Sequence, residues 1–412
     1  MHRNDKEGCT VDIAQWKEEL QAELQGNILK FWMEQTVDDE HGGFVGEIDG
    51  QLRIDPRADK GLVLNARILW SFASAYRLFP NSEYKKMADR AYDYLKNHFI
   101  DRDNGGLFWS VDYTGQPAQT KKQVYGQAFY IYALAEYNRA FGSQEAIDLA
   151  IGIYQLLERH AYEPVHKGYI EALTLDWKQT DDLSLSNKDL NEKKSMNTHL
   201  HVLEAYTNLY RVWKSEELKR SLTELIEVTL DHIIDPEHAR FELFFDESWQ
   251  VKGHHISYGH DIEGSWLLYE AAEVLGTPSL LERVERMALA MAEAVLADGI
   301  DKDGGIWNEA DQSGVTDSNK DWWPQAEAMV GFYNAYQLSG EDKFRAAAWH
   351  SWNFIKAYIV DPAGGEWYWG VDQAGKPLAH EPKVSPWKCP YHNSRACLEM
   401  LERLERQALS LH

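Results

Sequence analysis

The chain alternates between two kinds of helical pattern. In the stretch 61–79 the apolar residues follow the 3.6-residue helical period over more than one face, which predicts a helix buried on most sides. Its periodic positions are Leu62, Leu69, Phe72, Ala73 and Tyr76, and Ile68 and Ala75 widen the apolar face. The stretch 83–98 carries charged residues around a narrower apolar stripe, as an outer helix that faces water does. The pairs 124–141 and 144–159 repeat this alternation.

A glycine and aromatic signature separates these helical pairs and returns six times, at intervals of about 60 to 70 residues. The copies begin at Gly42, Gly105, Gly168, Phe241, Gly304 and Gly364. The fourth copy, 241–245, lacks the glycines, so the repeat is imperfect there. Self-similarity at a fixed period indicates stacked units of one kind, and six such units are expected to share one core.

Six inner helices in a ring, each backed by an outer helix, make an (α/α)6 barrel. We therefore predict an all-α fold with short β-hairpins at one rim, formed by residues 1–412 as a single catalytic domain. The β-rich stretches, such as 106–111, are too short for a central sheet. The polar segments 178–194 and 314–320 are expected to be loops, the first of them a candidate lid over the site.

Composition and charge limit the classes of molecule that this protein is expected to bind. The 16 tryptophans exceed what a core usually needs and favour a site that binds a sugar or another ring. A net charge of -24 disfavours nucleic acid and anionic membrane surfaces, which leaves a neutral or cationic small molecule. No run of about 20 apolar residues and no apolar signal-peptide core near the N-terminus is present, which predicts a cytoplasmic protein, and a monomer is favoured. Cys9, Cys389 and Cys397 are expected to be reduced thiols, because their spacing suits neither disulfides nor zinc.

Polar and aromatic residues occupy the early turns of the predicted inner helices at the same spacing as the repeat. They are Arg67, Tyr125, Gln127, Asn197, His201, His260, Glu263, Trp323, Glu327 and His392. In a closed ring, equivalent positions meet at one end of the central axis. Each residue also has a structural explanation: Arg67 as a buried ion pair, His260 as a helix cap, Asn197 bonded to His201. Their convergence in one register nevertheless predicts a catalytic site.

Two imidazoles on opposite sides of a carbon atom are able to remove a proton from one face and return one to the other. We expect Glu263, one turn after His260, to orient that ring, and Glu327 to be the candidate partner of His392. Arg67, His201 and Tyr125 are candidates to stabilise a developing oxyanion. Trp323 and Trp387 offer flat faces on which sugar rings stack.

A metal site was weighed against this chemistry. His201, His260 and His392 together match the three-histidine ligand set of catalytic zinc. The pairing of histidine with Glu or Asn on the same helix and the lack of an HExxH pattern favour acid–base chemistry instead. We expect no metal and no cofactor.

At these residues the chain resembles the N-acylglucosamine 2-epimerase superfamily, and within it the cellobiose 2-epimerases. The resemblance spans about 27–399 and is most specific in KGLVLNARILW (60–70), SMNTHLHVLEAY (195–206), YGHDIE (258–263), WWPQAEA (322–328) and WKCPYHN (387–393). It implies reversible conversion of the reducing-end glucose of a β-1,4-linked disaccharide to mannose, without a cofactor. The matching positions imply His260 and His392 as the acid/base pair, His201 in ring opening and Arg67 on the enediolate oxygen. Those implied to orient or stack the sugar are Tyr125, Asn197, Glu263, Trp323, Glu327 and Trp387.

Other activities stay open at this point. Within the same superfamily they are N-acylglucosamine 2-epimerase and aldose–ketose isomerase. Outside it, an inverting glycoside hydrolase is the alternative, because (α/α)6 barrels also carry paired carboxylates that flank a glycosidic bond. A non-catalytic sugar-binding protein is a further alternative.

Overall fold

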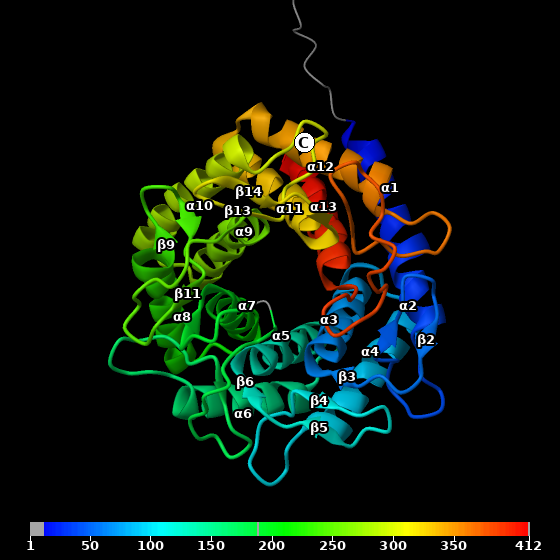
Figure 1. Cartoon of the computed structure of the whole chain (residues 1–412), viewed down its shortest axis with the longest axis vertical. Coiled ribbons are helices and arrows are strands. Elements are labelled where there is room, and N and C mark those ends of the chain that lie inside the picture. The colour runs from blue at the N-terminus through cyan, green and yellow to red at the C-terminus, as the bar shows by residue number, and fades with distance from the viewer. Residues whose placement is uncertain (1–11, 188, 411–412) are drawn as a thin grey trace, which may run out of the picture.

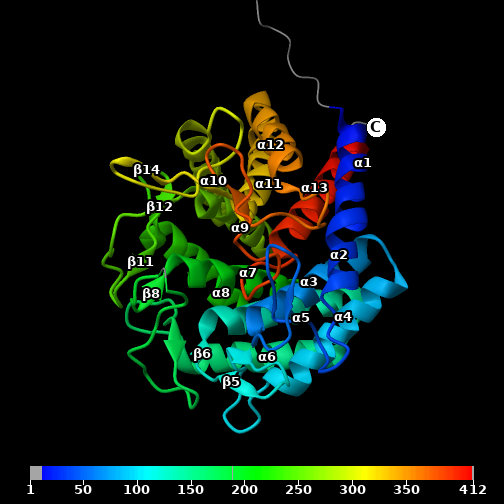
Figure 2. The same cartoon turned by 45° about the vertical axis from the view of Figure 1, so that its right-hand side comes forward.

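The computed structural model describes residues 12–187 and 189–410, except for the side chains of 408–410. Its helices form two concentric rings (Figure 1), and a view turned by 45° shows them stacked around one axis (Figure 2). The inner ring comprises α3 (Leu62–Leu78), α5 (Val124–Phe141), α7 (Met196–Val212), α9 (Tyr258–Leu275), α11 (Trp322–Ser339) and α13 (Tyr391–Ser410). The outer ring comprises α1 (Ile13–Glu23) with α2 (Leu29–Gln35), α4 (Ser82–Tyr94), α6 (Gln144–His160), α8 (Glu216–Val228), α10 (Pro278–Asp298) and α12 (Asp342–Phe354). The predicted (α/α)6 barrel is confirmed.

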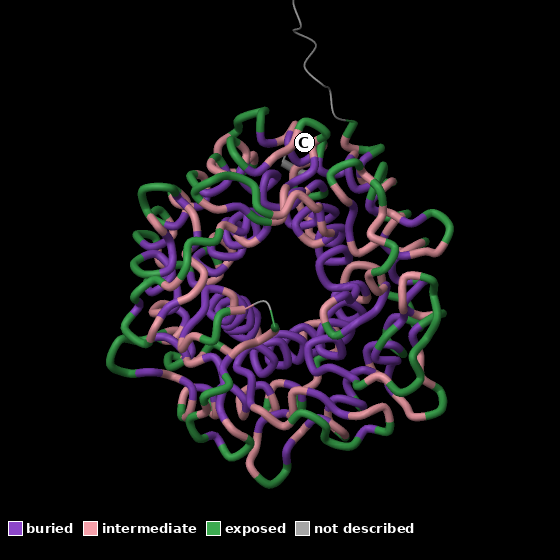
Figure 3. The backbone as a smooth tube through the Cα atoms, in the orientation of Figure 1, coloured by how far each residue is buried: buried purple, intermediate pink, exposed green. Residues whose placement is uncertain are grey.

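The two rings differ in burial as the apolar patterns predict. Every residue of α3 from Leu62 to Ala75 is buried, whereas α4 buries one stripe and exposes the rest. Figure 3 shows the same contrast around the ring, with the inner helices buried and the periphery exposed. Four outer helical segments contain or end in a single π-helical turn, at Leu24–Ile28, Leu95–Phe99, Thr229–Ile233 and Ile355–Ile359. Within the described residues, no helix has the length and hydropathy needed to cross a bilayer.

Each outer helix leads into the next unit through a tight hairpin built on the repeated signature. The hairpins are closed by the antiparallel pairs Val37–Phe44, Ile100–Leu107, Tyr162–Tyr169, Ile234–Phe241, Ile300–Ile306 and Val360–Trp367. Most of the turns use glycines with positive φ, such as Gly105 and Gly106. The glycine-free fourth copy makes the same turn with Ala239 at φ +52°. The prediction of short hairpins at one rim is confirmed, including the imperfect copy.

Short strands stitch neighbouring units together at this rim. The strand before an inner helix pairs with a strand of the next unit, as β3 (Lys60–Gly61) pairs with β4 (Ser110–Val111). The equivalent pairs are β6 (Lys122–Gln123) with β7 (Ala172–Leu173), β8 (Lys194–Ser195) with β11 (Phe244–Phe245), β12 (Ile256–Ser257) with β13 (Glu309–Asp311), and β15 (Lys320–Asp321) with β16 (Gly370–Val371). Ile48, in β1 (Glu47–Ile48), pairs with Val384 just before α13 and so joins the two ends of the chain. The remaining strands are β2 (Ile54–Asp55), β5 (Pro117–Gln119), β9 (Ile234–Asp235) and β10 (Arg240–Phe241).

One predicted loop is wrong. Much of the segment 314–320 forms β14 (Gly314–Asp317), which extends the β12–β13 pair to three strands. Its backbone polar groups are satisfied by the neighbouring strand in spite of its polar composition. The predicted loop 178–194 lacks helix and strand at its described positions up to 193, and its last residue, Lys194, begins β8; residue 188 lies outside the described positions. Its role as a lid stays a prediction, as do the single domain, the monomer and the cytoplasmic location.

A buried lysine joins five of the six hairpins to the segment before the next inner helix, a feature that sequence reasoning missed. Four of these lysines stand two residues before an inner helix and meet an acid of the preceding hairpin turn. The pairs are Lys60–Asp38 at 2.7 Å, Lys122–Asp101 at 2.7 Å, Lys194–Glu163 at 3.2 Å and Lys320–Asp301 at 2.6 Å. In the fourth unit Ile256 takes this position. Lys383 pairs with Asp361 at 2.7 Å in the last unit.

The opposite rim, where the inner helices end, carries a network of arginines and glutamates. Arg77 pairs with Glu136 at 3.0 Å and Arg211 pairs with Glu270 at 2.8 Å, around a cavity of about 310 Å³. Cations near helix C-termini interact favourably with the helix dipole. Cys389 and Cys397 are buried free thiols, as predicted, whereas Cys9 lies outside the described residues.

The buried lysine pairs are expected to contribute strongly to stability. Lys122→Met leaves the Asp101 carboxylate buried without its cation, so the free energy of unfolding should fall by about 3–5 kcal/mol. Arg286→Met, which breaks the exposed Arg286–Glu282 pair, should change it by less than about 1 kcal/mol. Urea unfolding followed by tryptophan fluorescence measures both. If the free energy of unfolding fell equally in the two variants, loss of a buried ion pair would cost no more stability than loss of an exposed one.

Candidate active site

Eight of the residues predicted for the site occupy two equivalent positions of the inner helices, whereas His260 is the third residue of α9 and Trp387 lies before α13. Tyr125, Asn197, Trp323 and His392 are each the second residue of their helix. Arg67, His201, Glu263 and Glu327 are each the sixth. These two positions are about one helical turn apart and therefore share a face. Because the inner helices begin at the same rim, these faces gather around the axis at that end (Figure 1).

Trp323 contacts both of the histidines predicted to act as acid and base. Its ring centroid is 4.7 Å from that of His260 and 5.5 Å from that of His392. His260 and Trp323 are half-buried, whereas His392 is 6% exposed. The two imidazoles come from α9 and α13, which are not neighbours in the ring. The structure therefore brings the fourth and sixth units to one aromatic side chain.

A second aromatic group lies at the start of α5. Trp387 is half-buried, with its ring centroid 5.9 Å from Tyr125 and 6.1 Å from Trp109. The Tyr125 ring in turn contacts His201 edge to face at 4.9 Å. Trp109, from the second hairpin, was not predicted for the site. Trp109 is part of the second glycine and aromatic signature, so the sequence assigned it to the hairpin and not to the site.

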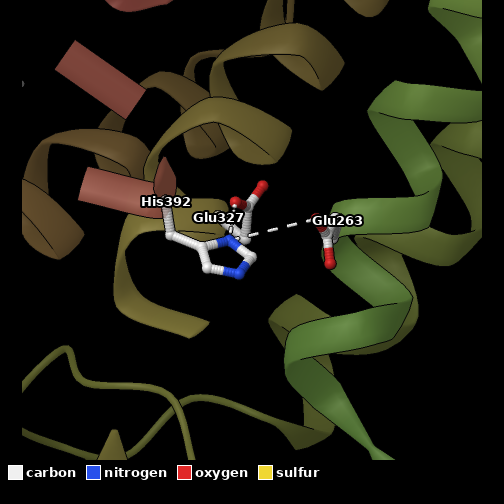
Figure 4. A group of neighbouring side chains, drawn as sticks. All are labelled: Glu263, Glu327 and His392. Atoms are coloured by element: carbon white, nitrogen blue, oxygen red, sulfur yellow. Dashed lines mark hydrogen bonds and ion pairs between the residues drawn. The ribbon is translucent and has the colours of Figure 1, made fainter. Parts of the chain in front are cut away.

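His392 is held by a buried carboxylate. Its Nδ1 is 2.6 Å from Glu327 Oε1 and 4.0 Å from Glu263 Oε1 (Figure 4). The second Glu327 oxygen accepts a hydrogen bond from Trp266 Nε1 at 3.0 Å. A carboxylate on one ring nitrogen fixes the tautomer and raises the basicity of the other. The predicted partnership of Glu327 with His392 is confirmed.

The predicted partnership of Glu263 with His260 is wrong. His260 Nδ1 lies 2.7 Å from the hydroxyl of Ser257, the residue before α9, and Glu263 accepts a hydrogen bond from Arg395 at 2.6 Å. Residues three apart on a helix are neighbours, but a stronger partner on another helix takes the Glu263 carboxylate. His260 therefore has a hydroxyl partner where His392 has a carboxylate.

His201 resembles His392 in its environment. Its Nδ1 is 2.9 Å from Glu204 Oε2, one turn along α7. The suggested bond between Asn197 and His201 is therefore wrong. Asn197 Oδ1 is a buried acceptor without a partner among the described residues. An unpaired acceptor at the second position of an inner helix is available to a hydroxyl group of a ligand.

Arg67 is buried without a carboxylate among the described residues, so the alternative of a buried ion pair is wrong. Its Nη2 donates to the Tyr125 hydroxyl at 2.8 Å, and its Nη1 lies 3.8 Å from Cys389 Sγ. The guanidinium stacks on Phe129 at 4.3 Å and on Tyr391 at 4.6 Å, and Nε has no partner. A buried cation without an anion favours an anionic group at this place.

Gln127, which shares the register of the site, has a structural role. Its amide binds the backbone N–H and carbonyl of Leu107, each at 2.9 Å, and so holds the hairpin. Gln325 binds Ile306 in the same way.

Arg395 is the residue at the centre of the site that sequence reasoning missed. Its Nη2 donates to Glu263 and to Glu327, each at 2.6 Å, and its Nη1 donates to Glu204 and to the Tyr391 hydroxyl. The Tyr391 hydroxyl itself donates to Glu204. The signal for Arg395 was its position one turn after His392 on the same helix.

Burial sets the protonation of the three imidazoles. It lowers the pKa of His260 to about 3, with a further contribution from His201. It also lowers the pKa of His392 to about 3, although Glu327 acts in the opposite direction. Burial, Arg67 and Arg395 lower the pKa of His201. All three rings are therefore neutral at pH 7.

The carboxyl groups divide according to their contacts. Burial and the neighbouring Glu327 raise the pKa of Glu263. Burial acts in the same direction on Glu327, but Arg395 and His392 outweigh it and lower the pKa. Glu263 and Glu327 therefore both bond to Nη2 of Arg395, but Glu263 binds a proton more readily than Glu327 does.

Donor atoms of Glu263, Glu327 and His392 lie within 4.8 Å of one another, a spacing that would suit a metal ion (Figure 4). Arg395 already supplies positive charge there, since its Nη2 bonds both carboxylates. A cation at the same place would be repelled by the guanidinium. Within the described residues, His201, His260 and His392 do not form the three-histidine cluster that was weighed as a zinc site.

Comparison with known proteins supports one family. The family model for N-acylglucosamine 2-epimerase matches residues 42–396. A cellobiose 2-epimerase from Bacteroides fragilis is 47% identical over 93% of this chain and 98% of its own length, and one from Dictyoglomus turgidum is 39% identical over 96% and 100%. The solved structure of cellobiose 2-epimerase from Bacillus thermoamylovorans B4167 superposes with a TM-score of 0.91 at 40% identity, covering 95% of this chain and all of that one. The chain belongs to the N-acylglucosamine 2-epimerase family.

Proposed function

We propose that this protein is a cellobiose 2-epimerase, which reversibly inverts C2 of the reducing-end glucose of a β-1,4-linked disaccharide. Cellobiose and lactose are the expected substrates, and mannobiose is a further candidate. The observation that carries the proposal is the pair of neutral imidazoles, His260 and His392, which both contact Trp323. The identity of 47% to a cellobiose 2-epimerase supports the same activity.

The proposed reaction begins with opening of the glucose ring, which exposes a carbonyl at C1 and makes the proton on C2 removable. One imidazole abstracts that proton, and a cis-enediolate forms. After rotation about the C2–C3 bond, the other imidazole, which has taken up a proton from solvent, delivers it to the opposite face of C2 and becomes neutral again. The first imidazole releases its proton to solvent, and ring closure gives mannose. No step in this sequence needs a redox or group-transfer cofactor.

Arg67 is proposed to stabilise the enediolate oxygen together with Tyr125, because the guanidinium has no carboxylate partner. His201, backed by Glu204, is proposed to assist ring opening at the O1 and O5 oxygens. Asn197 Oδ1 is available to a sugar hydroxyl. Trp323 and Trp387 are proposed to stack on the two pyranose rings.

The helix ends support an anionic intermediate at this rim. All six inner helices begin there, and helix N-termini carry a partial positive charge. Glu263, whose pKa is raised, lies 4.0 Å from His392 Nδ1 and is proposed to retain a proton near the acid/base pair. Glu327, held as a carboxylate by Arg395, is proposed to orient His392.

The hydrolase alternative requires one free carboxyl acid and one free carboxylate base on opposite sides of a bond. Glu204, Glu263 and Glu327 instead all bind Arg395. The geometry therefore favours epimerisation over hydrolysis. Protonation of the enediolate at C1 would yield a ketose, so slow conversion of lactose to lactulose is expected as a side reaction.

Product analysis in deuterium oxide tests the reaction class. Incubation with cellobiose should yield glucosyl-mannose with deuterium at C2, because the proton passes through imidazoles that exchange with solvent. Proton NMR of the product measures both outcomes. Release of free glucose would support a hydrolase, and unchanged cellobiose would support a binding protein. Parallel incubations with lactose, mannobiose and N-acetylglucosamine separate the members of the family.

Removal of either acid/base ring should abolish turnover while the fold survives. His260→Ala and His392→Ala are each expected to lower kcat by about 10²- to 10⁴-fold, the usual contribution of a positioned acid or base. His350→Ala, on the exposed side of α12, is the matched control and should keep full activity. A variant that retains most of its activity and a native circular dichroism spectrum would exclude that histidine from the acid/base pair.

The buried histidines should resist protonation. Because burial lowers the pKa of His260 and of His392 to about 3, both rings should stay neutral at pH 5.5 in the folded protein. An imidazole with the ordinary pKa of about 6.5 would be mostly protonated there. Nitrogen-15 NMR of histidine-labelled protein measures the titration. Midpoints near pH 6.5 for these two rings would contradict the assigned burial effect.

A further inference from the structure

We propose that Arg395 is a positioning residue that holds Glu204 and Glu327 as carboxylates, and that these carboxylates fix the ring tautomer of His201 and His392. The catalytic consequence rests on the proposed epimerase function. The tautomers themselves exist in the protein without substrate, so that part of the proposal is independent of the reaction.

The contacts of Arg395 join three helices to a fourth. From α13 the guanidinium reaches Glu204 on α7, Glu263 on α9 and Glu327 on α11. It is 1% exposed and lies between the Trp266 ring at 4.8 Å and the Tyr391 ring at 4.2 Å. The aromatic rings leave its plane little freedom to turn.

The two dependent histidines share one geometry. His201 Nδ1 faces Glu204, and His392 Nδ1 faces Glu327, at 2.9 and 2.6 Å. An ionised carboxylate only accepts hydrogen bonds, so each ring must carry its proton on Nδ1. The Nε2 lone pair then points away from the carboxylate and is free to act as a base.

A protonated carboxyl would reverse this arrangement. Without a cation, three buried carboxylates in contact would repel one another, and protons would neutralise some of them. A neutral carboxyl donates its proton to an Nδ1 lone pair, which moves the ring proton to Nε2 and removes the base. The guanidinium supplies positive charge within the cluster and acts to lower the pKa of Glu204 and of Glu327, against the burial that raises both.

The groups that face the cluster are known for every inner helix. The charged or titratable ones are Arg67 from α3, Tyr125 and Tyr132 from α5, His201 and Glu204 from α7, His260 and Glu263 from α9, Glu327 from α11, and Tyr391 and His392 from α13. Arg67 is the other cation among them, and it has no carboxylate partner. Within the described residues, Arg395 is therefore the cation that donates hydrogen bonds to all three of these carboxyl groups.

His260 is an internal control. Its Nδ1 faces the Ser257 hydroxyl, which both donates and accepts, and within the described residues the hydrogen bonds of Arg395 go to other groups. Its tautomer should therefore not depend on Arg395. Arg403, also on α13 and 5.8 Å from the Trp266 ring, pairs with Glu399 instead and gives a matched control variant.

Nitrogen-15 NMR of histidine-labelled protein, without substrate, reads the tautomers directly. In Arg395→Met we expect His201 and His392 to shift toward the Nε2–H form while His260 stays unchanged, and Arg403→Met should alter none of the three. kcat with cellobiose should fall by at least about 10²-fold, with a smaller change in KM. Arg395→Lys restores the positive charge but not the planar guanidinium, which donates to several carboxyl groups at once, so it should recover part of the lost kcat. Unchanged tautomers in folded Arg395→Met would overturn the proposal.

An isosteric variant keeps the test decisive if Arg395→Met fails to fold. Glu204→Gln should change the tautomer of His201 alone. The amide oxygen takes the Oε1 place, where Arg395 and Tyr391 donate, so the amide N–H faces His201 and donates to its Nδ1. A wild type that leaves disaccharides unchanged would remove the proposed function, but the tautomer results would stand. An unchanged His201 tautomer in folded Glu204→Gln would overturn the positioning role.

Discussion

The ion cluster around Arg395 is the interaction on which the rest of the site depends. Three carboxylates from α7, α9 and α11 converge on one guanidinium from α13, all of them buried. Each partner would be costly to bury alone, so the cluster is satisfied only when all four helices occupy their places. The same cluster orients the imidazole of His392. Closure of the ring and assembly of the site are therefore one event.

The two ends of the barrel use helix polarity in opposite ways. The N-terminal ends face the proposed substrate, where partial positive charge favours an anionic intermediate. The C-terminal ends carry arginines in the last turns of three inner helices, paired with glutamates around a cavity. At the rim that carries the candidate site, buried lysines pair with the acids of the hairpin turns. The candidate site and the lysine pairs thus lie at the same rim and use different side chains.

Particular residues show where sequence reasoning succeeded and where it failed. The repeat placed Arg67, His201, Glu263 and Glu327 in one register, and the structure confirms it, since a fixed period carries over directly into helix position. Spacing along one helix predicted that Glu263 pairs with His260 and suggested that Asn197 bonds to His201, and neither pair forms. In both cases a different group took the partner. Arg395 escaped notice because its three carboxyl partners lie far away in sequence.

The sequence by itself determined the barrel, the number of its units, the rim that carries the site and the residues that face the axis. These follow from periodicity, which is a local property of the chain. Only the tertiary structure decided which carboxylate serves which imidazole and that one arginine holds three carboxylates. Those pairings depend on distances between helices, and competition among several buried partners is resolved by geometry that no single stretch of sequence contains.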